Sequence, residues 1–184
     1  MPQLFTFVLK KPKEITMIAK IISGGQAGAD RAGLDVAIRH GFPHGGWCPK
    51  GRKAEDGTIG GQYQLVQTLT DDSLQHTEWN VRDSDGTVVF TLGMDATGAS
   101  MRAADFAKMH GKPCIHISPT GDGFMDPAVK LQRFVLEHGI HVLNVAGSRE
   151  SEEQGIYRWV WQVIDDAFFW NKTHGDMLGG PGEG

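Results

Sequence analysis

Short apolar runs alternate with longer segments of helical periodicity along most of the chain. The apolar runs end at loops of small residues, and the longer segments repeat apolar side chains at i, i+3 and i+4, which is typical of helices buried on one face. This alternation predicts an α/β fold with a Rossmann-like, doubly wound, mainly parallel sheet and helices on both faces. The predicted strands are residues 18–22, 88–92, 114–117 and 140–145, and the predicted helices are residues 28–40, 103–110, 127–138 and 152–169.

Three other segments have a weaker pattern. Residues 42–61 are rich in Gly, Pro and charge, which indicates a long loop, and Trp47 favours an ordered, functional one. Residues 65–74 are either a short helix or an irregular lead into the next strand. Residues 77–81 are either extended or helical.

The chain of 184 residues is long enough for one α/β domain with a substantial core. We expect a single ligand-binding domain over residues 17–170, between an N-terminal extension of residues 1–16 and a flexible tail of residues 171–184. As an alternative, the apolar residues 4–9 add an edge strand to the sheet.

Three of the predicted strands are followed by loops of glycines and hydroxyl side chains. The first loop opens a helix, so its free N–H groups lie at a positive helix end that suits a phosphate. Its GGxxG spacing is neither the dinucleotide fingerprint nor the Walker loop, and a purely structural turn is the alternative. Because the carboxyl ends of neighbouring parallel strands converge on one crevice, we expect the loops to contact one ligand. The candidate ligand-binding residues are Ser23, Gly24, Gly25, Gln26, Gly28 and Asp30, then Thr97, Gly98 and Ser100, and finally Gly147, Ser148 and Arg149.

A cluster of cations lies in the long loop after the first helix. Lys50 and Arg52 stand close to Trp47, whose ring offers a stacking surface for a flat ligand. We therefore add Lys50 and Arg52 to the candidate ligand contacts. The alternative is a solvated basic turn that two neighbouring acids balance.

Composition narrows the choice of partners. The formal net charge is −4 and no long basic run occurs, which argues against a nucleic-acid partner. Only two cysteines are present, as is usual in a reducing cytoplasm, and no stretch is apolar enough to span a membrane. Trp161 and Trp170 lie near the edge of the last apolar stripe and are candidates for a contact within a homo-oligomer.

Metal binding has little support in the sequence. Asp83 and Asp85 are residues of the type that hard cations prefer, but a turn before a strand has the same composition. The eight histidines are scattered without the spacing of a metal site. We therefore predict no metal site in the protein itself.

Several blocks in order resemble a known family. The blocks SGGQAGADRAGLD, HGGWCPKGRKAEDG, TEWNVRDSDGT and VLNVAGSRESEEQGIY are similar to the provisionally assigned molybdenum carrier family, a circularly permuted YpsA-like branch of the SLOG superfamily. The resemblance runs from Met17 to about Phe169 and implies a Rossmann-like protein with a nucleotide-type pocket. In unpermuted relatives, such as DprA and the lonely-guy phosphoribohydrolases, a strand like VLNVAGSRE opens the domain, whereas here it is the last strand.

The resemblance implies a cofactor carrier or nucleotide sensor, whose cargo is molybdenum cofactor, a pterin with a terminal phosphate, or a nucleotide. The alternative is a nucleotide N-glycoside hydrolase in which Asp30, Glu78 or Glu150 activates water. The related phosphoribohydrolases carry a glutamate close to the position of Ala103, which speaks against hydrolysis by that residue. A DNA-associated module like DprA is a third possibility, and the acidic balance of the chain disfavours it.

Overall fold

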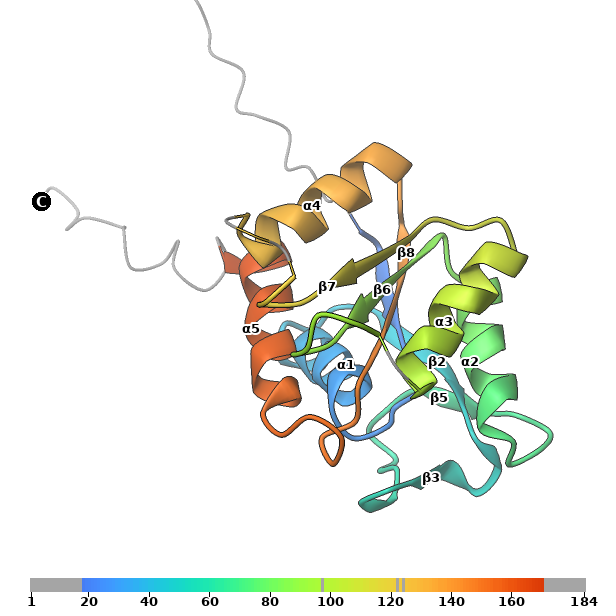
Figure 1. Ribbon diagram of the computed structural model, residues 1–184. Helices are drawn as coiled ribbons and strands as arrows, with labels where there is room; N and C mark the ends of the chain where they lie inside the picture. Colours follow the sequence, from blue (N-terminus) through green and yellow to red (C-terminus); the bar gives the residue numbers. More distant parts are fainter. Residues whose placement is uncertain (1–17, 97, 122, 124, 171–184) are drawn as a thin grey trace, which may run out of the picture.

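The computed structural model describes residues 18–170, except 97, 122 and 124. Its centre is a parallel sheet with the strand order β5-β2-β1-β8-β6-β7 (Figure 1). The strands are β1 (Lys20–Ile22), β2 (His44–Cys48), β5 (Leu65–Gln67), β6 (Gly86–Phe90), β7 (Cys114–Ile117) and β8 (Val142–Gly147). A short hairpin of β3 (Lys53–Ala54) and β4 (Gly57–Thr58) stands apart from the sheet.

Helices cover both faces of this sheet. On one face, α1 (Ala29–Arg39), α4 (Pro127–His138) and α5 (Ile156–Phe168) pack together, and on the other face α2 (Ser73–Arg82) packs against α3 (Gly98–Met109) (Figure 1). The buried strand β6 contributes side chains to the cores on both faces of the sheet. Its Val88 and Phe90 join the large core under α1, α4 and α5, while Val89 between them joins the smaller core under α2 and α3. The predicted doubly wound α/β fold is therefore confirmed.

Two strands of the central sheet and the short hairpin were not predicted. β2 and the hairpin lie within the segment that we expected to be a loop, and β5 lies in the segment that was expected to be helical or irregular. β2 has the sequence HGGWC, which carries no β-branched residue. Gly46 is required there because a Cβ at this position would stand 2.3 Å from the carbonyl oxygen of Ser23, the residue after β1. The glycines that weaken the strand pattern thus allow the strand to approach its neighbour.

The segment that the sequence left undecided between extended and helical structure belongs to α2. This helix starts after Asp72, whose side chain accepts a hydrogen bond of 2.9 Å from the Leu74 N–H. A single three-residue helical turn, Lys50–Arg52, occurs between β2 and the hairpin.

The last strand of the chain occupies the middle of the sheet. β8 pairs with β1 on one side and with β6 on the other, both in parallel. Counted from β8, the strands β2, β1, β8, β6 and β7 follow the order 3-2-1-4-5, the usual order of a doubly wound sheet. The chain therefore has the topology of a Rossmann-like domain whose first strand and helix have moved to the end.

The loops after β1 and β8 are locked together by their backbones. Gly28 and Arg149 form an isolated antiparallel bridge, in which the Ala29 N–H donates to the Ser148 carbonyl at 3.2 Å and the Glu150 N–H donates to the Ala27 carbonyl at 3.2 Å. The φ angle of Gly28 is 106°, and a Cβ there would lie 2.5 Å from the Ser148 oxygen. Only glycine fits this position.

In the described part of the chain, every helix is too short or too polar to cross a lipid bilayer.

Gly28→Ala should lower the free energy of unfolding by more than about 3 kcal/mol, because it adds backbone strain to a clash with an immobile carbonyl. Gly41→Ala is the matched control, since Gly41 also has a positive φ of 60° but nothing lies within 4 Å of its added Cβ. The control should cost about 1 kcal/mol. Urea unfolding of both variants measures the difference, and equal losses would contradict the tight contact between the loops.

Candidate functional site

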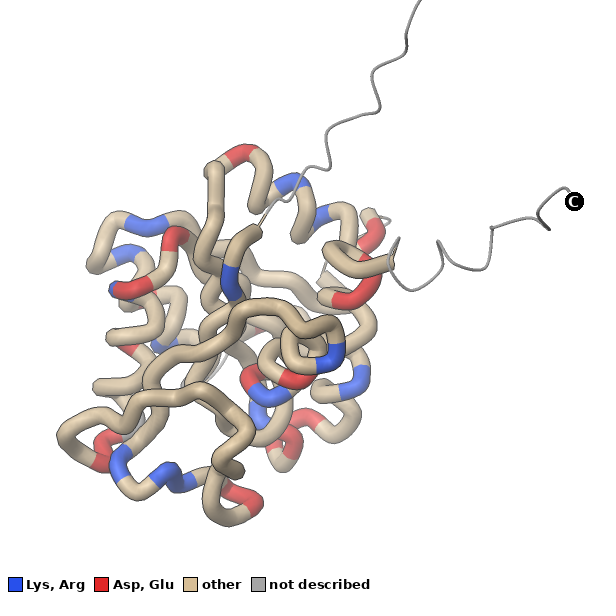
Figure 2. Tube along the Cα trace, turned by 180° about the vertical axis from the view of Figure 1, so that it is seen from behind, with Lys and Arg blue, Asp and Glu red and all other residues tan. Residues whose placement is uncertain are grey.

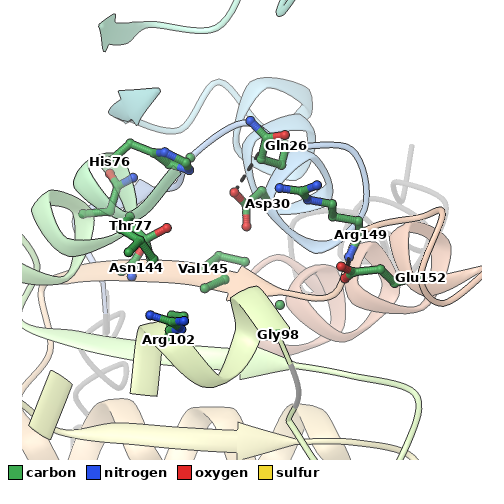
Figure 3. Close-up of a pocket in the computed structure, with 15 residues that line it drawn as sticks. Gln26, Asp30, His76, Thr77, Gly98, Arg102, Asn144, Val145, Arg149 and Glu152 are labelled. Carbon is green, nitrogen blue, oxygen red and sulfur yellow. Dashed lines mark hydrogen bonds between the residues drawn. The ribbon is translucent and has the colours of Figure 1, made fainter. Parts of the chain in front are cut away.

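A cavity of about 320 Å³ opens at the carboxyl ends of β1 and β8. The chain segments around it are the loop after β1, the end of β8 with the loop that follows, the middle of α2, and the first turns of α3 (Figure 3). Its volume is in the range of small-ligand sites. The lining residues are Gly24, Gln26, Asp30, Leu74, His76, Thr77, Asn80, Gly98, Arg102, Asn144, Val145, Ala146, Gly147, Arg149 and Glu152.

Two arginines give the cavity its positive charge. Arg149 and Arg102 both line it, and neither guanidinium has a hydrogen-bond or ion-pair partner among the described residues. Figure 3 shows Arg149 on one side of the cavity near Gln26 and Asp30, and Arg102 on the other side beside α3. The cavity therefore has two unneutralised cations that face a common space, an arrangement suited to an anion.

Several backbone N–H groups near the cavity are already used by the chain's own carboxylates. Asp30 accepts a long hydrogen bond of 3.4 Å from the Gln26 N–H, and Glu152 accepts one of 3.0 Å from the Arg149 N–H. Glu153 accepts from the N–H groups of Leu92 and Gly93, at 2.7 and 2.8 Å, in the loop after β6. These carboxylates thus take up part of the N–H groups that a phosphate would otherwise contact.

The backbone contacts of Glu153 also affect its pKa. Partial burial opposes its ionisation, but the N–H groups of Leu92 and Gly93 outweigh that cost, so the pKa of Glu153 is lower than usual. Glu153 stays ionised and ties the loop after β8 to the loop after β6.

Asp30 behaves differently, because its carboxyl group lies in the wall of the cavity. Burial raises the pKa of Asp30 from 3.8 to about 7, and contacts with Gln26, Arg149 and Gly24 offset only part of that rise. Burial, together with the charge of Arg149, lowers the pKa of His76 to about 4. At neutral pH the cavity thus contains a neutral imidazole and a carboxyl group that is about half ionised.

Gly24 separates these two groups. A Cβ on Gly24 would lie 2.7 Å from Asp30 Oδ2 and 2.9 Å from His76 Cδ2, so any larger residue would push one of the two side chains away. The Gln26 side chain is held nearby, because its amide donates to the Lys53 carbonyl of the hairpin at 2.9 Å.

The structure brings together six of the fourteen predicted ligand-binding residues. Gly24, Gln26, Asp30, Gly98, Gly147 and Arg149 all line the cavity. Ser23, Gly25, Gly28, Ser100 and Ser148 are buried beside it without lining it, and Thr97 lies outside the described residues.

The predicted cations of the long loop have other surroundings. The Arg52 guanidinium donates to four backbone carbonyls between residues 59 and 65, at 2.7 to 3.1 Å, and holds that segment together. Lys50 is exposed, and neither residue lines the cavity. Trp47 donates to Asp83 at 2.7 Å and packs edge-on against Trp79, so its ring also lies outside the cavity. Arg52 and Trp47 therefore have partners within the protein, and the ligand contact of Lys50 and Arg52 stays a prediction.

Two of the candidate catalytic acids are engaged elsewhere. The Glu150 carboxylate accepts from the N–H groups of Gly155 and Tyr157, at 2.6 and 3.0 Å, at the start of α5. Glu78 contacts His110 of α3 at 3.1 Å. Neither acid lines the cavity, which leaves Asp30 as the candidate acid that does.

The sequence did not reveal the contribution of α2 or of Arg102. His76 and Asn80 are four residues apart and lie on one face of α2, but the sequence left residues 77–81 undecided between extended and helical structure. Arg102 lies in the first turns of α3, close to the predicted loop that carries Thr97, Gly98 and Ser100. Its position beside this loop is the sequence signal that could have identified it.

The described residues contain no cluster of three or more metal-binding side chains. Asp83 is bound by Trp47 and Arg82, and Asp85 accepts from the N–H groups of His141 and Val142. The turn that contains both acids therefore has a structural explanation.

The chain matches known proteins over most of its length. The model of the circularly permutated YpsA SLOG family matches residues 21–168. Among solved structures, the chain is 43% identical to a protein from Syntrophus aciditrophicus SB that is provisionally named a molybdenum carrier protein, with a TM-score of 0.79. The match covers 84% of this chain and 96% of that one. No protein with a curated description matches the chain.

Asp30→Asn should change how stability depends on pH. Because the pKa of Asp30 is higher in the folded protein than its ordinary value, the folded state binds more protons than the unfolded state between about pH 4 and 7. This carboxyl group therefore costs stability as the pH rises through that range. Relative to the unmodified protein, Asp30→Asn should gain about 2 kcal/mol between pH 5 and pH 8, measured by urea unfolding.

Glu137→Gln is the control for this experiment, because Glu137 is an exposed carboxylate on α4. Its effect on the free energy of unfolding should be the same at both pH values. A constant difference for Asp30→Asn as well would rule out a raised pKa at Asp30.

Proposed function

The chain belongs to the circularly permuted YpsA family of SLOG proteins, and from this membership we propose that it binds a small phosphate-bearing ligand in the cavity beside β8. We propose further that it acts as a carrier or sensor of that ligand rather than as an enzyme. The ligand is a nucleotide or a pterin cofactor.

The two arginines without partners carry this proposal. Arg149 and Arg102 approach the cavity from opposite sides, and the first turn of α3 at Gly98 adds the positive end of a helix (Figure 3). Arg31 and Arg52, by contrast, have partners within the protein, Arg31 with the Asp56 carboxylate and Arg52 with backbone carbonyls. Two cations left unpaired around one cavity indicate an anionic group on the ligand.

The distribution of charge over the rest of the surface fits a small ligand better than a nucleic acid. Basic and acidic residues of the described chain are interspersed, without a continuous basic face in the view from behind (Figure 2). An extended phosphate backbone requires a basic track, whereas a single phosphate requires only a local pair of cations.

Molybdenum cofactor is the cargo that we propose first, because the similar protein from Syntrophus aciditrophicus SB carries a molybdenum carrier name. The cofactor combines a ring system with one terminal phosphate, and the cavity offers arginines for the phosphate and the polar side chains of Asp30 and His76 for the ring. A nucleoside monophosphate has the same two parts.

Carriage without turnover is favoured over N-glycoside hydrolysis. Glu78 and Glu150 are engaged outside the cavity, and Ala103, at the place where related hydrolases carry a glutamate, is buried against Val81 and Val89. Asp30 is the one candidate acid of the three that reaches the cavity. The hydrolase hypothesis then depends on the carboxyl group of Asp30 alone, and a carboxyl group in this position is equally suited to ligand recognition.

We also propose that the protein works in the cytoplasm as a homo-oligomer. Cys48 and Cys114 are free thiols, as expected in a reducing compartment. Trp170 is 50% exposed at the end of α5, where a subunit contact would cover it.

Arg149→Gln and Arg102→Gln should each weaken the binding of a phosphate-bearing ligand by about 10- to 100-fold, because each removes a charge-assisted hydrogen bond. Isothermal titration with GMP and with ribose 5-phosphate measures this loss. Arg158→Gln is the control, since Arg158 is an exposed arginine of α5 outside the cavity. Equal affinity of all three variants and the unmodified protein would refute the proposed phosphate site.

Incubation with AMP, GMP and ADP-ribose should leave all three compounds intact, as judged by chromatography for free base and phosphorylated sugar. Release of base that Arg149→Gln abolishes would instead assign the protein to the hydrolases. In that event Asp30→Asn should abolish the release as well, because no other candidate acid lines the cavity.

A further inference from the structure

The wall of the cavity at Gly24 presents two polar atoms to one point. The place where a Cβ of Gly24 would stand lies 2.7 Å from Asp30 Oδ2 and 3.2 Å from His76 Nε2. That place is one bond length from the Gly24 Cα, so no ligand atom can occupy it, but the two polar atoms lie on the same side of Gly24 and all three residues line the cavity. A ligand group in the cavity in front of Gly24 would contact both side chains.

Both atoms are hydrogen-bond acceptors. Asp30 makes no ion pair among the described residues, and its bond from the Gln26 N–H is long, at 3.4 Å. His76 is 5% exposed and neutral, and its Nδ1 atom has no partner at hydrogen-bonding distance. With the proton of the neutral ring on Nδ1, the lone pair of Nε2 faces Gly24.

Other polar groups of this wall are already used. Asn80 exchanges two hydrogen bonds of 2.8 Å with the backbone of Trp47, and Asn144 donates to Thr87 at 3.1 Å. The charge of Arg149 acts on both Asp30 and His76 and disfavours a cation between them. A neutral group with several N–H donors satisfies these conditions.

We infer that Asp30 and His76 select a ligand ring with an amino group next to a ring N–H, the edge that guanine and pterins share, and that they discriminate against adenine. The amino group would lie in front of Gly24 and donate to both side chains, while the ring N–H donates to the second oxygen of Asp30. In adenine the atom next to the amino group is a ring nitrogen with a lone pair, which an ionised Asp30 repels. This inference rests on the proposed function and specifies its ligand.

The test compares the affinities of GMP, IMP, AMP and ribose 5-phosphate by isothermal titration at pH 8.5, where Asp30 is ionised. GMP should bind at least about 10-fold more tightly than AMP, and IMP, which lacks the amino group, should bind more weakly than GMP. Asp30→Asn should remove this preference without weakening the binding of ribose 5-phosphate, because Arg149 and Arg102 are retained. Glu137→Gln, outside the cavity, should leave all four affinities unchanged.

The pH dependence of the unmodified protein gives an independent readout. Below pH 7 a protonated Asp30 donates to the ring nitrogen of adenine, so the ratio of GMP affinity to AMP affinity should fall by about 10-fold or more between pH 8.5 and pH 6. The ligand phosphate titrates in the same way in both nucleotides and cancels from the ratio. Arg149 keeps its charge, His76 stays neutral, and the remaining acid of the cavity, Glu152, affects both ligands alike.

Equal binding of AMP and GMP at pH 8.5, with both weakened by Arg149→Gln, would overturn this inference and leave the phosphate site standing. A ratio that does not change with pH would overturn it as well. Failure of GMP, AMP and ribose 5-phosphate alike to bind would overturn the proposed function and the inference together.

Discussion

The site depends on one backbone contact, between Gly28 in the first loop of the chain and Arg149 in the last. Because the two loops exchange hydrogen bonds directly, the start of α1 and the loop before α5 are fixed relative to each other. This contact places Asp30, in the first turn of α1, in the same cavity as Arg149. A side chain at Gly28 would separate the loops and with them the two charged groups of the cavity.

A second constraint concerns the N–H groups that parallel strands and helix starts leave unpaired. In this protein Asp30, Glu152 and Glu153 accept hydrogen bonds from them, as an exogenous phosphate does in other nucleotide sites. Arg149 and Arg102 stay unpaired among the described residues, so their side chains are available to a ligand anion. The raised pKa of Asp30 is the cost of this arrangement, since a carboxyl group kept in a cavity for recognition destabilises the empty fold when it ionises.

Sequence patterns predicted the elements whose burial follows a simple period. Four strands of the sheet and the loops after β1 and β8 were predicted, because apolar runs and glycine turns are local signals. β2 escaped prediction because its Gly46 is required by the close approach of Ser23, a residue distant in sequence. The carbonyl partners of Arg52 escaped prediction for a related reason: a cation beside a tryptophan predicts a ligand contact, and only the folded loop brings these carbonyls together. The features that were predicted depend on local sequence patterns, whereas those that were missed depend on partners that only the fold brings close.

Circular permutation leaves such a site intact for a geometric reason. The cavity is formed by the carboxyl end of β8, by the loop after β1 and by two helices of the opposite face, and none of these groups requires a particular order along the chain. The site requires only that β1 and β8 are neighbours in the sheet. Their parallel pairing, from Lys20 with Val142 to Ile22 with Asn144, provides this. In the unpermuted order a helix connects these two strands directly. Here the two strands are adjacent without a direct connection. The backbone hydrogen bonds at the Gly28–Arg149 bridge therefore hold the loops after β1 and β8 together in place of a connecting segment.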